Sequence, residues 1–257
     1  MPLVLYGKRK GSAFIWKPDN HEFGPQHRMS DIPRNSEGYF LNHPEVDGLW
    51  HQVINSLLAE SDRGAVLIGT TYVDANLKRL FEVIAPQDLS KRRLEPILKY
   101  PGPLSSFAAR THVAFLCRLI HRSLYDAIEA LREIRNQVAH EPDTFVLGNH
   151  RDKLERILSL GPGLPLWVNR MACELLRGSF LANALEIKLP DSEKPAFETE
   201  TDVLKYIQGR SDLLAPLNDR LPRCELAIGI VFICALLIKR PRGGASCLRC
   251  VSDMGTV

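Results

Sequence analysis

The chain has 257 residues, of which 45% are hydrophobic and 25% are charged. This length and hydrophobic content are sufficient for one large domain with a buried core. The net charge of +3 is only mildly basic, well short of the composition that would by itself indicate a nucleic-acid-binding protein. Charge alone therefore does not identify a partner.

Cysteine usage and the N-terminus indicate a soluble protein of the cytoplasm. The six cysteines are few for this length and irregularly spaced, a pattern that fits reduced thiols better than a disulfide framework. The first residues lack an apolar core of signal-peptide length, and no uninterrupted apolar run reaches the roughly 20 residues that span a bilayer. We therefore expect a cytoplasmic protein without a membrane span.

The sequence contains no convincing metal or cofactor motif. Cys247 and Cys250 have the two-residue spacing of a zinc hairpin, but a structural zinc site generally uses a second close pair, and Cys224 and Cys234 are ten positions apart. The histidines show no ligand spacing, and the sequence carries no glycine-rich phosphate loop, nucleophile elbow or helix-turn-helix signature. Neither a metal nor a cofactor is expected.

Between residues 44 and 188 the apolar residues recur at helical spacing, without strand-like alternation. The pattern predicts helices over about 44–58, 62–84, 105–120, 124–140, 151–160 and 166–187, with a basic, proline-rich loop at 85–104. The third of these helices, capped by Ser105 or Ser106, is expected to bury Leu116 and Cys117. The predicted fold is all-α: a compact multi-helix bundle with irregular N- and C-terminal extensions.

Two extensions flank the predicted helical domain of residues 44–188. Residues 1–43 show neither helical nor strand periodicity. In the second extension, residues 189–257, positions 203–217 indicate a broken helix and positions 226–238 form an apolar run before a flexible tail. At about 1.5 Å per residue that run covers roughly 20 Å, against a hydrocarbon core of about 30 Å. We interpret it as a packing or oligomer helix, with a membrane-surface or marginally inserted segment as the alternative.

The helix at 124–140 ends in the hexad Arg135-Asn136-Gln137-Val138-Ala139-His140. At about 100° per residue, Arg135 falls roughly 50° from the centre of the apolar stripe. A buried guanidinium keeps its charge and needs a carboxylate, carbonyl groups or a bound anion as partner. Asp62 lies about 45° from the centre of the stripe of an earlier helix. The sequence therefore predicts that Arg135 pairs with Asp62 or Glu60 and locks two helices together.

The same hexad permits a catalytic interpretation. Arg135 could clamp an anion while His140 acts as a general acid or base near pH 7, a combination that suits phosphodiester cleavage without a metal. One chain provides a single set of these residues. A two-fold dimer that places two such helix ends together would give a shared cleft with two arginines and two histidines.

Four segments together resemble the mannitol-operon repressor (MltR) family. They are Glu60-Ser61-Asp62-Arg63-Gly64, Asp74 within YVDANL, Gly102-Pro103-Leu104-Ser105-Ser106-Phe107-Ala108-Ala109-Arg110, and the hexad. The resemblance covers about residues 44–188 and implies a helical fold that self-associates as a homodimer or larger homo-oligomer. It also implies a repressor-like role in transcription through a protein partner, without direct DNA binding. The residues expected to form structural ion pairs or interactions are Glu60, Asp62, Arg63, Asp74, Arg110 and Arg135.

The hexad is also similar to the Arg-x4-to-6-His signature of HEPN domains, helical modules that include metal-independent ribonucleases. In that interpretation Arg135 and His140 are catalytic, Asn136 orients them, and RNA is the substrate. This signature is short and tolerant, so it is weaker than the four-segment resemblance. The chain is accordingly expected to act without catalysis, with an endoribonuclease as the alternative.

Overall fold

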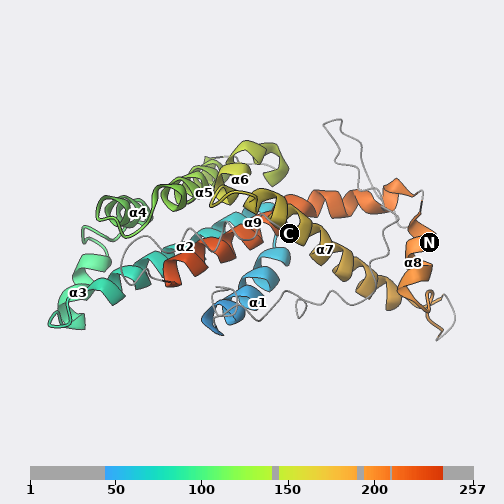
Figure 1. Ribbon diagram of the computed structural model, residues 1–257, viewed down its shortest axis with the longest axis horizontal. Coiled ribbons are helices and arrows are strands. Elements are labelled where there is room, and N and C mark those ends of the chain that lie inside the picture. Colours follow the sequence, from blue (N-terminus) through green and yellow to red (C-terminus); the bar gives the residue numbers. More distant parts are fainter. Residues whose placement is uncertain (1–43, 141–144, 190–193, 209, 240–257) are drawn as a thin grey trace.

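The computed structural model describes residues 44–140, 145–189, 194–208 and 210–239. Over these ranges the chain forms nine α-helices and one 3-10 turn (Figure 1). Their bounds are α1 Pro44–Leu58, α2 Asp62–Ile84, α3 Lys91–Leu98, α4 Phe107–Leu116, α5 Arg122–His140, η3 Leu147–His150, α6 Arg151–Leu158, α7 Leu164–Leu185, α8 Glu200–Ile207 and α9 Ser211–Ile238. The all-α fold class is confirmed. The residues assigned to the extension 1–43 and to the final tail lie outside the described ranges.

Helix α9 runs through the middle of the molecule and packs against α1, α2, α6 and α7 (Figure 1). Every residue from Cys224 to Ala235 is buried. A helix that is apolar on all sides needs neighbours on all sides, and the packing-helix interpretation of positions 226–238 is confirmed. The predicted broken helix at 203–217 is confirmed, because α8 ends at Ile207 and α9 begins at Ser211. The second part is longer than predicted, since α9 continues through Pro216 and Pro222 into the apolar run.

Among the described residues, α9 is also the one helix long and apolar enough to cross a membrane, with a mean hydropathy of 2.2 over its most apolar window. The sequence predicted no membrane span because its apolar run, at positions 226–238, is only 13 residues long. The helix is longer than this run because it begins at Ser211. However, 78% of the window is buried inside the protein. Packing within the fold accounts for its apolar composition.

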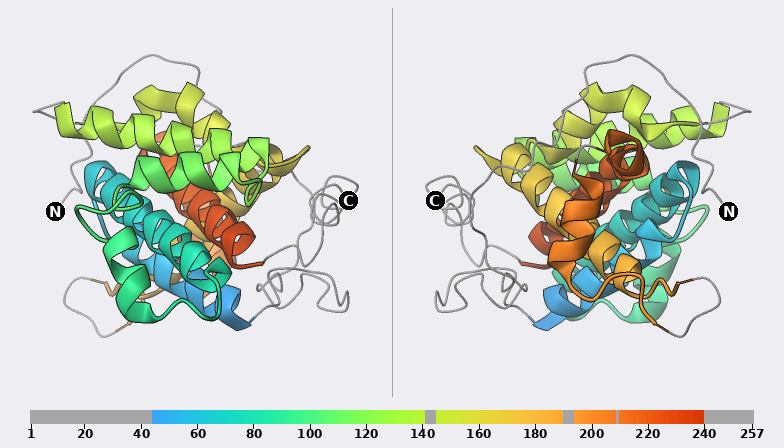
Figure 2. Two further views of the ribbon diagram at one scale, coloured as in Figure 1. Left: turned by 90° about the vertical axis from the view of Figure 1, so that its left-hand side faces the viewer. Right: turned by 90° about the vertical axis from the view of Figure 1, so that its right-hand side faces the viewer.

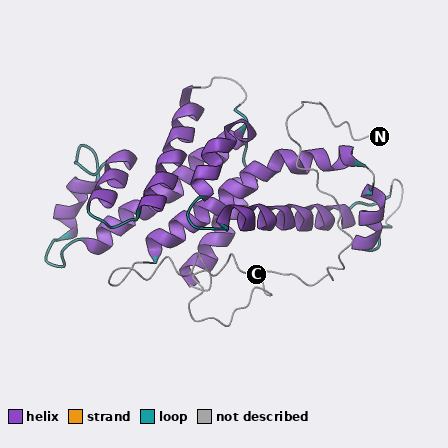
Figure 3. Ribbon diagram, turned by 45° about the horizontal axis from the view of Figure 1, so that its top comes forward, coloured by secondary structure: helices purple, strands orange, loops and turns teal. Residues whose placement is uncertain are grey.

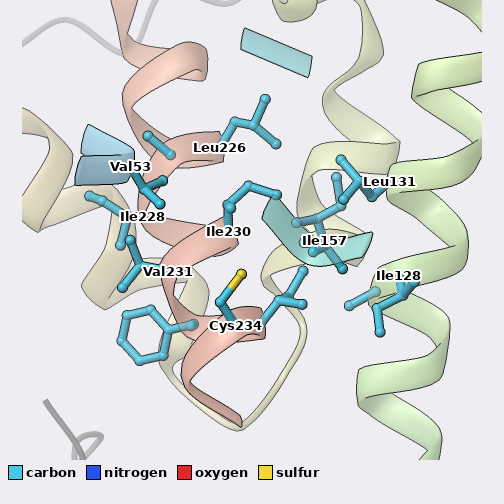
Figure 4. Packing of buried hydrophobic residues seen from close by; sticks show 14 of the residues in the cluster. Val53, Ile128, Leu131, Ile157, Leu226, Ile228, Ile230, Val231 and Cys234 are labelled. Atoms are coloured by element: carbon cyan, nitrogen blue, oxygen red, sulfur yellow. The ribbon is translucent and has the colours of Figure 1, made fainter. Parts of the chain in front are cut away.

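Helix α5 lies across one side of the bundle and contacts α2, α4 and α6 (Figure 2). The predicted apolar stripe of this helix is confirmed, because all its members are at most 2% exposed: Leu124, Ala127, Ile128, Leu131, Ile134 and Val138. In the core, Ile128 and Leu131 of α5 and Ile157 of α6 lie on one side of α9, and Val53 of α1 lies on the other (Figure 4).

Two local predictions were wrong. The predicted loop at 85–104 contains α3 (Figure 3), whose Leu94, Ile97 and Leu98 share one face at helical spacing despite Pro96 and a basic first turn. Helix α4 stops at Leu116, which is 77% exposed, and its cap residue Cys117 is also exposed. The apolar pattern continued to Ile120 in the sequence, but a turn separates Ile120 from the helix and redirects the chain into α5.

The close packing of α9 on α6 depends on Gly229. A Cβ added there would lie 2.8 Å from Cδ2 of Leu158 and 3.3 Å from Cγ2 of Ile157, whereas a Cβ added at Gly178 in α7 would meet nothing within 4 Å. We expect Gly229→Val to lower the free energy of unfolding by about 1 to 3 kcal/mol through overpacking. Urea unfolding followed by circular dichroism measures this change. Gly178→Val is the matched control, and equal effects of the two substitutions would contradict the packing argument.

Candidate functional site

The hexad at the end of α5 is exposed except on one side. Val138 is 1% exposed, whereas Arg135, Ala139 and His140 are exposed. Nη1 of Arg135 lies 3.4 Å from Oδ1 of Asn136, to which it donates a hydrogen bond. The expectation that Arg135 is buried against an acidic residue was wrong. In these last turns of α5 only Ile134 and Val138 remain fully buried, so a side chain at the edge of the stripe reaches solvent.

Asp62 is paired as the sequence required, but with a different arginine. Its Oδ1 accepts a hydrogen bond of 2.9 Å from Nε of Arg223 in α9, and its Oδ2 accepts one of 2.8 Å from the backbone N–H of Leu147. Arg223 also donates to the backbone carbonyl of Glu60. The predicted lock between α2 and α5 is therefore a lock between α2, η3 and α9. Arg63, the next residue of the same motif, is half-buried in the first turn of α2.

Asp74 and Arg110 form a second ion pair, between α2 and α4. Nη2 of Arg110 lies 2.5 and 2.7 Å from the two carboxylate oxygens, and Nε lies 3.0 Å from Oδ1. Nη1 donates to the carbonyl of Leu104 at 2.6 Å. Arg110 is 4% exposed, so the pair and this carbonyl satisfy a buried guanidinium. The loop that provides this carbonyl also passes very close to α3. A Cβ added at Gly102 would lie 2.0 Å from the carbonyl oxygen of Pro96, so only glycine, which has no Cβ, fits at this position.

A third ion pair was not predicted from the sequence. Glu225 of α9 is 0% exposed. Its carboxylate accepts hydrogen bonds from both Nη1 and Nη2 of Arg151 in α6, and from Nδ2 of Asn169 in α7 at 2.7 Å. The carboxylate precedes the apolar run by one residue, which was the available signal. Each of these three ion pairs joins helices, and none of them lies at the hexad.

The junction of α4 and α5 carries a surface that the sequence reasoning missed. We call it the α4–α5 tip; it comprises His112, Phe115, Leu116, Arg118, Arg122 and Tyr125. The rings of Phe115 and Tyr125 stack with centroids 4.4 Å apart, and the guanidinium carbon of Arg122 lies 5.9 Å from the Phe115 centroid. Nδ1 of His112 lies 3.1 Å from the Tyr125 hydroxyl oxygen. Aromatic residues and arginine are enriched at protein interfaces.

The described cysteines do not favour a metal site. Burial raises the pKa of Cys224 to about 12 and that of Cys234 to about 12, so both stay protonated at neutral pH. Within the described ranges no three histidine, cysteine or acidic side chains come together in a way that could hold a metal ion. Cys247 and Cys250 lie outside the described residues.

The similarity of this chain to known proteins is found among solved structures. No protein-family model matches the chain, and no curated protein matches it. Among solved structures, the chain is similar to one described as the MtlR-HPr complex from Escherichia coli, at 16% sequence identity. The similarity covers 74% of this chain and 98% of that one, with a TM-score of 0.43.

Arg110 and Arg135 are expected to differ sharply in how much each contributes to the stability of the fold. Arg110→Ala leaves Asp74 without its partner and should lower the free energy of unfolding by about 2 to 4 kcal/mol, less than for a fully buried pair because Asp74 is partly exposed. Arg135→Ala should change it by no more than about 0.5 kcal/mol. Denaturant unfolding of both variants measures the difference. A large loss in Arg135→Ala would restore the helix-lock interpretation.

His121 caps the N-terminus of α5, and its protonation should weaken the fold. Its Nδ1 accepts a hydrogen bond from the backbone N–H of Leu124 at 3.4 Å and lies 2.7 Å from Oγ of Ser123. Burial lowers the pKa of His121 in the folded state. The folded protein therefore binds fewer protons at this residue, so stability should fall as the pH drops below about 6.5, the unfolded-state value, toward the lower folded-state pKa.

The substitution His121→Asn isolates this contribution. Asparagine is a good N-cap residue that does not titrate. Urea unfolding between pH 7.5 and 5 should show a smaller loss of stability in the variant than in the natural sequence. The same pH dependence in both proteins would contradict the assignment of His121 as a titrating cap.

Proposed function

We propose that this chain is a repressor-like regulator of transcription that acts in the cytoplasm through a protein partner and has no DNA-binding motif of its own. The observation that carries the proposal is where the charged residues of the MltR-like segments lie. Asp62 and Asp74–Arg110 hold helices together. Residues committed to the fold in this way are available neither for catalysis nor for contacts with DNA phosphates. Recognition of the partner protein then depends on other residues, which lie on the surface.

We further propose that the chain works as a homo-oligomer, as the resemblance implies. The second candidate, a HEPN-type endoribonuclease, is favoured by one observation: Arg135 and His140 are both exposed. They lie five residues apart on one continuous helix, which is about 140° of rotation around its axis. One chain therefore does not direct both side chains at the same phosphate. Cleavage would require a second chain to complete the site.

Two measurements test the proposal. Deletion of the gene in its native cell should raise a limited set of transcripts, and the natural chain and Arg135→Ala should both restore repression. Purified protein incubated with labelled RNA in a chelator should leave the RNA intact. Cleavage that disappears in both Arg135→Ala and His140→Ala, but persists when the exposed His51 is replaced by alanine, would overturn the regulatory function in favour of the ribonuclease.

A further inference from the structure

The turn that ends α4 contains an arginine where glycine is normally favoured. Arg118 has φ 55°, in the left-handed region. The N–H of Leu119 donates to the carbonyl of Ala114 at 2.8 Å, and the N–H of Arg118 donates to that of Phe115 at 2.9 Å. These two bonds define a Schellman motif, whose left-handed position is most often occupied by glycine because a Cβ is strained there.

The side chain of Arg118 does not compensate for this strain within the described fold. The residue is exposed. Among the residues that the structure describes, no carboxylate pairs with it, whereas its neighbour Arg122 is paired with Asp126 at 2.9 Å. A left-handed non-glycine residue costs about 1 to 2 kcal/mol. Arg118 is thus a residue that lowers local stability and leaves a charged group available at the surface, which is characteristic of a binding position.

An exposed apolar side chain lies two residues away from this arginine. Leu116 is 77% exposed and follows Phe115, whose ring stacks on that of Tyr125. The other arginine of the tip, Arg122, is paired with the neighbouring Asp126, and the two charges largely neutralise each other. The uncompensated charge of the surface is therefore positive, and it sits at the edge of an apolar patch.

We propose that the α4–α5 tip docks an acidic segment of the partner protein, with a partner carboxylate on Arg118 and an apolar partner side chain on Leu116. This inference rests on the proposed function and specifies the surface through which it acts. Charge complementarity selects the occupant. Arg118 is the uncompensated charge of the tip, and it lies two residues from the exposed Leu116. A partner segment with a carboxylate next to an apolar side chain matches both groups, whereas a nucleic-acid backbone offers a row of phosphates and no apolar side chain for Leu116.

The left-handed conformation of Arg118 allows a loss of binding to be distinguished from a loss of stability. Arg118→Gly removes the guanidinium and also relieves the strain, so the melting temperature should be equal to or higher than that of the natural protein. A loss of binding in this variant cannot then be attributed to unfolding. Arg118→Lys keeps a charge but loses the two-point geometry of the guanidinium and should bind at an intermediate level.

The binding measurement uses the full chain in its native cells. A photo-cross-linking phenylalanine analogue replaces Leu116, and in a matched control it replaces Leu166 of α7, which is similarly exposed at 75%. Mass spectrometry identifies the cross-linked peptide. We expect a partner peptide with aspartate or glutamate within a few residues of the cross-link at position 116 and not at 166, and a yield at least about ten-fold lower with Arg118→Gly.

The other outcomes overturn the inference. They are a cross-link to a second copy of this chain, to nucleic acid or to a peptide without acidic residues, an equal yield at position 166, and an unchanged yield with Arg118→Gly. The transcript measurement separates the two proposals. If repression is found while the cross-link is independent of Arg118, only the docking surface fails. If the cross-link depends on Arg118 while no transcript responds to the deletion, only the regulatory function fails.

Discussion

The fold depends on burying the second half of α9 at the centre of the bundle. The transition from polar to buried residues in this helix occurs between Arg223 and Glu225, and each of these charges is paired with a different neighbour. A carboxylate that is 0% exposed, as in Glu225, is tolerated only when its partners are in place. Arg151 and Asn169 therefore tie the position of α6 and α7 to the register of α9.

The ion pairs Asp62–Arg223 and Asp74–Arg110 complete this arrangement at two other points of the bundle. Asp62 fixes the start of α2 to α9, and Asp74 fixes the middle of α2 to α4. The arginine partners of both aspartates explain why an acidic residue suits each of these positions. Such contacts specify how the helices pack. They leave the chemistry that distinguishes a regulator from a nuclease to residues on the surface.

Periodicity predicted most helices correctly because burial of one helix face requires apolar residues at a regular spacing in the sequence. The charged contacts were harder, since they depend on which elements meet. The sequence identified Asp62 as a charge that needs a partner, but Arg223 is 161 residues away along the chain. It assigned Leu116 to a buried face because the apolar pattern continues past the end of α4. The left-handed turn at Arg118 carried no glycine or asparagine to mark it.

The position of the α4–α5 tip relative to the ion pairs bears on how it would bind. Arg110 lies on α4 only two turns before Arg118, and it anchors that helix to α2 and to the preceding loop. On the other side of the junction, His121 caps α5. The tip is therefore held from both ends, and its apolar and charged groups keep fixed positions before a partner arrives. Such preorganisation reduces the entropy lost on binding, so a small surface with one arginine and one leucine can be selective.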